Sequence, residues 1–413
     1  MSARVEVINT GTELLLGKTL NTHLTFLAEA LFPLGLRIQR QLCVPDGEVI
    51  GRAIEETFGR ADIVLVTGGL GPTSDDITRE IVADLLGRPL RRDPKLVAGL
   101  EAWMARRGRD LQAENLRQAD VLEGAEVIDN PHGTAPGIYI PKVRADIPDL
   151  FLLPGPPREL HPMMRDTVIP MLWSICGAEE TAASIRQIKF FGVGESEIAN
   201  RLEAKLAAMD GLEHGYCARP GEVELRFIGN AATIDRAVSL ARETYPRELF
   251  TEEDVSLEQV VVGLLVERGE SIATAESCTG GLIASRITDV PGASSVLHRG
   301  LVTYANEAKV ALVGVSQDDL NEHGAVSEPV ARQMAEGALA KANADHAVAV
   351  TGIAGPGGGS EDKPVGTVFI AVASSGGATV VEQHAYPSDR LTFKQMISLR
   401  ALDLVRRRLL GFV

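Results

Sequence analysis

The stretch ADIVLVTGGLGPTSDDITREIVADLLG (residues 61–87) decides the fold class of this chain. It opens with a short apolar run rich in valine and isoleucine, which is typical of a buried strand. Glycines end that run, and the residues after them have the period of an amphipathic helix, with Ser74 or Asp75 as the expected N-cap. Strand, glycine loop and helix make a βα unit. Repeated units give a parallel sheet, and ligands bind beyond the carboxyl ends of its strands.

Similar units precede and follow this stretch. VEVINTGTELLLGK (residues 5–18) begins as a strand and turns at Gly11 into a helix expected to continue through residues 20–35. A helix capped near Ser256 introduces a third set of strands, whereas residues 175–255 alternate strands and helices in the manner of a small α+β domain. The sequence predicts an α/β protein: two parallel-type α/β domains, residues 1–172 and 256–413, joined by an α+β domain of residues 173–255.

The composition of the chain argues against several classes of binding partner. The chain has 413 residues and a formal net charge of −15, which disfavours a broad surface for nucleic acid. No signal-peptide pattern or apolar run of membrane-spanning length is present, so we expect a cytoplasmic protein without a membrane partner. The four cysteines are far apart, which argues against a zinc or redox motif.

The first glycine loop combines glycines, two hydroxyls and the adjacent carboxylates Asp75 and Asp76 at the end of a strand. Such a loop can bind an anion or a metal ion, because glycines allow close approach and carboxylates are hard ligands. The two aspartates can equally serve only to cap the helix and complement its dipole. Glu13, Gly137 and the LPGPPRE turn (residues 153–159) are expected to converge on the same crevice.

A second glycine loop occurs in ESIATAESCTGGLIASRITD (residues 270–289), where Ser277 lies between a strand and a helix. A serine there can be a nucleophile if a base lies nearby, and the loop N–H groups around Cys278 to Gly281 can hold an oxyanion. Lys309 is a candidate base, provided that its surroundings lower its pKa. The alternatives are a helix N-cap for Ser277 and a surface lysine for Lys309.

The N-terminal region resembles the molybdopterin-binding-type domain of the competence/damage-inducible protein A (CinA) family. NTGTELLLGKTLNT (residues 9–22), VTGGLGPTSDDITRE (residues 66–80) and LPGPPREL (residues 153–160) carry the resemblance. It implies an ADP-ribose pyrophosphatase that requires a divalent metal ion, with potassium as a possible additional ion, and metal ligands at Asp75 and Asp76. The implied nucleotide or anion site comprises Thr12, Glu13, Gly68, Gly69, Gly71, Thr73, Gly137, Pro154 and Gly155.

The C-terminal region resembles the CinA amidase domain through TAESCTGGLIASRIT (residues 274–288) and GLVTYANEAK (residues 300–309). The resemblance implies hydrolysis of the amide of nicotinamide mononucleotide by a homodimer without metal. Ser277 matches the nucleophile and Lys309 the base, with Tyr304 and Thr279 in support. The substrate-binding set comprises Cys278, Gly280, Gly281, Thr351, Gly352, Gly355, Gly357, Gly358 and Arg390.

Two details qualify this assignment. Cys278, although next to the serine, is expected to be a small packing residue rather than a nucleophile. In YPSDRLTFK (residues 386–394), Lys394 replaces an arginine that the family pattern has, so bidentate phosphate recognition is lost there. The alternatives to a bifunctional enzyme are an amidase whose N-terminal domain only binds a pterin or nucleotide, and a non-enzymatic adaptor for DNA uptake or repair.

Overall fold

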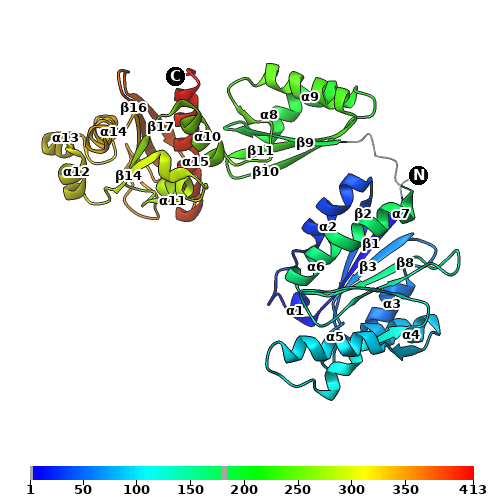
Figure 1. The fold of residues 1–413 in the computed structure, drawn as a ribbon. Coiled ribbons are helices and arrows are strands. Elements are labelled where there is room, and N and C mark those ends of the chain that lie inside the picture. The colour runs from blue at the N-terminus through cyan, green and yellow to red at the C-terminus, as the bar shows by residue number, and fades with distance from the viewer. Residues whose placement is uncertain (1–2, 178–183) are drawn as a thin grey trace. The chain divides into compact units, whose positions relative to one another are not determined.

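The computed structural model describes residues 3–177 and 184–413, and the chain divides into two compact units, Met1–Ala182 and Ala183–Val413 (Figure 1). Among the described residues, no helix is both long and apolar enough to cross a membrane.

The first unit is built on a six-stranded sheet, in the order β2-β1-β3-β8-β7-β6. Four neighbouring strands are parallel, and the last two are antiparallel. The parallel strands are β1 (Arg4–Thr10), β2 (Arg37–Val44), β3 (Ile63–Thr67) and β8 (Asp149–Leu153); the others are β7 (Gly137–Ile140) and β6 (Glu126–Ile128). Every residue of β3 is buried, as its apolar run predicts for a central strand.

Helices cover both faces of this sheet (Figure 1). One core cluster packs α3 (Val49–Glu55) and α4 (Thr78–Leu86) against the strands. The other packs α2 (His23–Leu31), α6 (Pro157–Met163) and α7 (Ile169–Cys176). The helix α5 (Pro94–Ala105) and the 3-10 helix η2 (Ala113–Ala119) follow α4, and the short strands β4 (Leu90–Arg92) and β5 (Asp120–Leu122) pair beside them.

Two helix predictions in this unit are wrong, the continuity of the helix after Gly11 and the start of the helix after β3. The helix after β1 is only α1 (Thr12–Leu15), and α2 begins anew at His23, because Gly17 adopts φ +65 and the side chain of Asn21 accepts the N–H of His23. Helix α4 begins at Thr78 rather than beside Ser74 or Asp75. There the Thr78 hydroxyl donates to the carbonyl of Gly68, which ties the helix start to the glycine loop.

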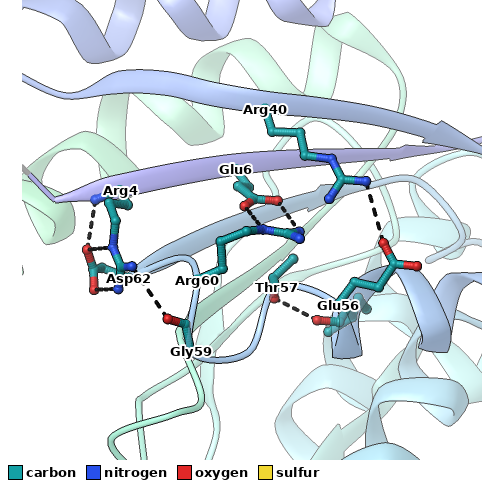
Figure 2. A network of polar contacts seen from close by, with 9 residues as sticks. Arg4, Glu6, Arg40, Glu56, Thr57, Gly59, Arg60 and Asp62 are labelled. Atoms are coloured by element: carbon teal, nitrogen blue, oxygen red, sulfur yellow. Dashed lines mark hydrogen bonds and ion pairs between the residues drawn. The ribbon is translucent and has the colours of Figure 1, made fainter.

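Arginine–carboxylate pairs gather near the amino end of β1 (Figure 2). Arg4 pairs with Asp62 at 3.0 Å, and Arg60 pairs with Glu6 at 2.5 Å. These contacts tie β1 to the loop that precedes β3, at the end of β1 opposite to Gly11. They are structural contacts, since both carboxylates already have cationic partners.

The second unit contains two sheets. The first is antiparallel, in the order β10-β11-β9-β12, and comprises β9 (Ser184–Phe191), β10 (Glu213–Arg219), β11 (Glu222–Gly229) and β12 (Leu249–Thr251). Helices α8 (Glu195–Ala207) and α9 (Ala231–Thr244) share its core. This is the predicted α+β region. Its Phe191 and Phe250 extend into the core of the following region, so the two pack together.

The second sheet has the order β14-β13-β15-β16-β17 and is parallel only in part. Strands β13 (Ile272–Glu276), β14 (Leu297–Val302) and β15 (His346–Gly352) are parallel. Strand β16 (Thr367–Ser374) pairs antiparallel with β15, and β17 (Val380–Ala385) pairs antiparallel with β16. Helices α10 (Leu257–Arg268), α11 (Leu282–Thr288) and α15 (Arg390–Leu409) pack on one face. Helices α12 (Asn306–Val313), α13 (Gln317–His323) and α14 (Glu328–Ala342) pack on the other. The fold is thus mixed α/β with parallel strands in both units.

Candidate functional sites

Ser277 and Lys309 meet in the second unit. Ser277 follows β13 directly, and its N–H donates to the carbonyl of Val350 on the neighbouring strand. Lys309 comes from α12, and its Nζ lies 3.2 Å from Ser277 Oγ. Ser277 is 8% exposed and Lys309 1% exposed. Neither alternative from the sequence holds, because Lys309 is buried and the N-cap of α11 is Gly281.

The surroundings of Lys309 fit a neutral amine. Besides Ser277 Oγ, its Nζ contacts the carbonyl oxygens of Thr303 and Tyr304 at 2.9 and 3.2 Å. A neutral amine has two N–H donors and one lone pair, which matches two carbonyls and one hydroxyl that donates. Burial lowers the pKa of Lys309, since a desolvated ammonium is disfavoured. The geometry therefore suits a base that accepts the proton of Ser277.

Glu276, the residue before the serine, holds the loop in place and was missed by the sequence reasoning. It is fully buried, and its carboxylate oxygens accept four strong hydrogen bonds. The donors are Thr279 Oγ1 (2.7 Å) and the N–H groups of Gly281 (3.0 Å), Ile283 (3.0 Å) and Ala284 (2.8 Å). Glu276 thus satisfies the first N–H groups of α11, which every helix leaves unpaired.

This arrangement revises the predicted oxyanion site. The N–H of Gly281 donates to the carboxylate of Glu276, and the N–H of Gly280 donates to the carbonyl of Ser277 at 3.1 Å. Of the four N–H groups expected from Cys278 to Gly281, those of Cys278 and Thr279 lie near the Cys278 sulfur and are the two without a recorded oxygen acceptor. The Thr279 side chain is fully buried, and its hydroxyl donates to the carboxylate of Glu276.

Cys278 is a packing residue, as expected. Its side chain is 4% exposed and belongs to the hydrophobic core beside α11. Burial raises the pKa of its thiol to about 12, which keeps the sulfur protonated at neutral pH. A protonated thiol is a poor nucleophile.

Cationic side chains from α15 approach the same loop. Arg390 donates to the hydroxyl of Tyr304 at 2.8 Å and to the carbonyl of Gly355 at 3.0 Å, and so links two predicted site segments. Tyr304 is 58% exposed. The Nζ of Lys394 would lie 3.8 Å from a Cβ atom added to Gly280. Lys394 therefore lies beside the glycine loop, even though it replaces the arginine of the family pattern.

The other predicted substrate-binding residues fall into two groups. Thr351 is buried and donates to the carbonyl of Ala325, and a Cβ on Gly352 would come within 2.9 Å of the Thr367 carbonyl. A Cβ on Gly355 would similarly collide with Val365. A structural hydrogen bond accounts for Thr351, and close packing accounts for Gly352 and Gly355, without a role in substrate binding. Gly357 and Gly358 are exposed, and a Cβ at either would meet nothing closer than 3.8 Å.

The first unit contains a cavity of about 500 Å³ at the carboxyl ends of β1, β3 and β8. It brings together most of the predicted residues: Glu13, Gly68, Gly69, Gly71, Asp75, Asp76, Pro154 and Gly155. The remaining three have other contacts. Thr12 donates to Asp46, Thr73 donates to Asp76, and Gly137 lies in β7, where a Cβ would come 2.6 Å from Met163 Sδ.

Two arginines hold the glycine loop of this cavity by its carbonyl groups. Arg79 is fully buried at the start of α4, and Arg117 comes from η2. Their four bonds go to the carbonyl oxygens of Leu70, Gly71, Thr73 and Asp76, at 2.7, 3.2, 2.7 and 3.1 Å. In a trans peptide the C=O and the next N–H point in opposite directions. The arginines therefore turn the N–H groups of Gly71 and Ser74 away from themselves, as donors toward an anion are turned in a nest. Pro72 has no N–H, and the N–H of Ile77 donates to the carbonyl of Asp75.

The carboxylates of the cavity differ from those of Figure 2. Glu13, Asp46, Asp75 and Asp76 all line the cavity, and the bonds recorded for Asp46 and Asp76 come from threonines rather than from arginine side chains. Among the described residues, no three His, Cys, Asp or Glu side chains group closely enough to hold a metal ion. A divalent ion here fits the usual magnesium pattern, in which one or two carboxylates are joined by substrate phosphates and waters.

A buried polar network beneath the cavity was also missed. Asn9 Nδ2 donates to Thr67 Oγ1 at 2.7 Å, and His23 Nδ1 lies 3.1 Å from the same hydroxyl. Asn21 and Gln41 both donate to Asn9 Oδ1. Burial lowers the pKa of His23, so a neutral ring is favoured. The signal available in the sequence was a polar residue at the carboxyl end of each apolar strand, Asn9 in β1 and Thr67 in β3.

Comparison with known proteins identifies the family. Models of the CinA C-terminal domain, of a probable molybdopterin binding domain and of the damage-inducible protein CinA KH domain match residues 254–409, 6–173 and 185–246, respectively. A CinA-like protein of Akkermansia muciniphila is 47% identical over 399 residues, which are 97% of this chain and 96% of that protein. The chain belongs to the CinA family. Another CinA-like protein, from Chloroherpeton thalassium, is 39% identical over 98% of this chain and 99% of its own length.

Solved structures of the family match parts of this CinA chain. A competence/damage inducible protein of Agrobacterium tumefaciens is 43% identical, covers 36% of this chain and 92% of its own, and has a TM-score of 0.36. The family assignment itself rests on the sequence matches. The KH-domain match falls on the α+β region, and residues 184–255 contain no G-x-x-G sequence, the backbone clamp of RNA-binding KH domains.

Proposed function

We propose that this CinA-family chain hydrolyses the carboxamide of nicotinamide mononucleotide to nicotinic acid mononucleotide and ammonia. The observation that carries the proposal is the buried pair of Lys309 and Ser277, with Nζ 3.2 Å from Oγ. A serine and a neutral lysine form a complete nucleophile and base for acyl transfer. The family resemblance supplies the substrate.

The reaction follows from the contacts. Lys309 takes the Oγ proton of Ser277 while Oγ forms a bond to the carboxamide carbon. The N–H groups of Cys278 and Thr279 stabilise the tetrahedral oxyanion. As the C–N bond breaks, Lys309 returns the proton to the leaving nitrogen, and ammonia departs. Water then attacks the acyl-enzyme ester with Lys309 as base, which releases the acid and restores Ser277.

The cationic groups of α15 would bind the phosphate of the substrate. Lys394 lies beside Gly280, and Arg390 links Tyr304 to the carbonyl of Gly355. A lysine binds phosphate as a point charge, whereas the planar fork of arginine binds two oxygens at once. Arg390 is therefore the stronger anchor. Its bond to the phenol oxygen fixes the position of Tyr304 and leaves the O–H proton of Tyr304 free.

The test is ammonia release from nicotinamide mononucleotide by the full chain in EDTA. Wild type should release ammonia, whereas Ser277→Ala and Lys309→Met should each lose about 10³-fold or more of kcat/KM. Lys341→Met, at an exposed lysine on α14, is the matched control and should keep full activity. Absence of ammonia release from folded wild type would reject the amidase proposal.

We also propose that the first unit cleaves the pyrophosphate of ADP-ribose with a divalent ion. The loop carbonyls held by Arg79 and Arg117 support it, because the resulting arrangement of N–H groups suits an anion. Glu13, Asp75 and Asp76 would share the ion with substrate oxygens. When bound, the ion would neutralise the developing phosphate charge. Water would attack one phosphorus, and the P–O–P bond would break to give AMP and ribose 5-phosphate.

ADP-ribose cleavage is tested with magnesium and with EDTA. EDTA should abolish it, and Asp75→Asn should lower kcat/KM at least about tenfold, a loss typical of a metal-site contact. Asp84→Asn changes an exposed aspartate on α4 and should have no effect. No cleavage by the folded wild type would leave binding without catalysis as the role of this unit.

The assembly and location remain proposals as well: a cytoplasmic homodimer that binds no nucleic acid. The net charge of −15 and the missing G-x-x-G support the last point. Sedimentation of the purified chain tests the dimer. Salt-dependent DNA binding would instead support the adaptor alternative.

A further inference from the structure

A second cavity, of about 480 Å³, adjoins the carboxylate cavity of the first unit. The two share Gln118 and Thr134 as lining residues. The second cavity is walled by α5 through Leu100 and Trp103, and by the loop after β6 through Asn130. Neither the glycine loop nor any carboxylate of the proposed metal site lines it. It is therefore a separate compartment within reach of a ligand bound in the first one.

Gln118, which lines both cavities, has a side-chain oxygen that a ligand could pair with. Its side chain is 1% exposed, and its Oε1 has no hydrogen-bond partner in the described structure. A buried amide oxygen without a partner is unfavourable and needs an explanation, such as a ligand donor. The terminal torsion of glutamine is soft, so the amide can turn either its oxygen or its nitrogen toward a ligand.

Trp103 gives the second cavity a flat aromatic wall. The guanidinium carbon of Arg107 lies 3.8 Å from the centroid of the Trp103 ring, and that of Arg106 lies 5.7 Å away. These cation–π contacts hold the ring at the cavity edge. Aromatic rings of this kind stack on nucleobases, which all present a flat face.

We infer that the second cavity is the subsite for the purine base of a nucleoside diphosphate whose pyrophosphate lies in the first cavity. The inference rests on the proposed pyrophosphatase function and names how that site selects its substrate. Trp103 stacks on the base, and the amide of Gln118 pairs with a neighbouring donor and acceptor. Glutamine makes such a bidentate pair with N6 and N7 of adenine.

The test uses tryptophan fluorescence, because the chain has only two tryptophans, Trp103 and Trp173. In a Trp173→Phe chain, AMP should change the Trp103 emission in a saturable way, and UMP should bind at least about tenfold more weakly. Gln118→Ala in the same background should weaken AMP about tenfold, the loss of one good base contact. Gln112→Ala, at an exposed glutamine beside η2, is the matched control and should leave AMP binding unchanged.

Hydrolysis of ADP-ribose is measured on the same proteins, so that the two proposals fail separately. If ADP-ribose is cleaved but AMP leaves Trp103 unchanged, or if Gln118→Ala binds AMP normally, the base subsite is wrong and the pyrophosphatase stands. An equal response to AMP and UMP also overturns the purine assignment. If AMP binds as expected and ADP-ribose is not cleaved, the subsite stands and the pyrophosphatase proposal is rejected.

Discussion

The two glycine loops of this chain follow the same strand-to-helix order, but side chains of opposite charge hold them. After β3, Arg79 and Arg117 bind the loop through its carbonyl oxygens. After β13, the carboxylate of Glu276 binds the loop and the start of α11 through their N–H groups. One loop is thus organised by cations and the other by an anion.

This difference determines what each loop can bind. Cations that occupy the carbonyls leave N–H groups for a ligand, which suits phosphates. Glu276 accepts the N–H groups at the start of α11, so these groups do not attract a phosphate. The remaining reactive groups of this loop region are the Ser277 hydroxyl and Lys309. On the proposed functions, the same local sequence pattern would serve an anion site in one unit and a nucleophile in the other.

The largest effect is expected from removal of the anion. Glu276→Ala leaves five donors without this acceptor, those of the four strong bonds and the Thr274 hydroxyl, and each buried group left unpaired costs about 1–3 kcal/mol. We expect a free energy of unfolding lower by at least about 3 kcal/mol, and ammonia release lower by about 100-fold or more. Thermal unfolding and the ammonia assay measure both. Glu267→Ala, at an exposed glutamate of α10, is the control, and an equal loss there would contradict the assigned role of Glu276.

The pH dependence of the amidase should follow Lys309. Because burial lowers its pKa, the neutral amine forms below the ordinary lysine value of about 10.4. Below the lowered pKa, kcat/KM should fall about tenfold per pH unit, since only the neutral amine accepts the proton. The stability contribution has the same sign: it is lost as the pH falls, because the unfolded chain keeps the proton more tightly. A flat profile across this range would contradict a lysine base.

Arg117→Ala should have a moderate effect confined to the first unit. It removes two bonds to loop carbonyls, whereas Arg79 keeps the other two. We expect KM for ADP-ribose to rise about fivefold with little change in ammonia release, corresponding to about 1 kcal/mol of binding. Arg91→Ala, at an exposed arginine of β4, serves as control. An unchanged KM would show that the loop keeps its shape without this arginine.

The smallest effect is expected at Cys278. The protonated, buried thiol packs in the core, so Cys278→Ala should lower stability by about 1 kcal/mol and change ammonia release less than about twofold. Steady-state kinetics and thermal unfolding check this. Complete inactivation of a folded Cys278→Ala chain would mean that the nucleophile is misassigned.

Local patterns in the sequence were sufficient for apolar strands such as β3 and β15, the glycine loops and one helix start, but not for short or edge strands such as β2, β6 and β17. Ser256 forms a capping box with Gln259, as its position predicts. The direction of β16 was not predicted, because hydrophobic periodicity does not encode strand direction. The signal available was residues 353–366, which connect β15 to β16 without a helix, whereas parallel neighbours usually need a helical crossover.

The candidate sites were predicted less completely, because their supporting contacts connect residues distant in sequence. Lys309 lies 32 positions after Ser277, and Arg117 lies 44 positions after Thr73. Glu276 was missed for another reason: three of its four strong donors are backbone N–H groups, which leave no trace in side-chain patterns. Motif resemblance singled out Ser277 and Lys309, which the structure brings together, but not the buried Glu276 beside them.

The most direct test of the opposite roles of the two loops is a crossed assay of Glu276→Gln and Arg79→Met. Ammonia release and the calorimetric affinity for ADP-ribose are measured on both chains and on wild type. Glu276→Gln should lose ammonia release and keep its ADP-ribose affinity, whereas Arg79→Met should bind ADP-ribose about tenfold more weakly and keep ammonia release. If the two folded variants lose the same activity, or if Glu276→Gln releases ammonia normally, buried charge does not set the function of these loops.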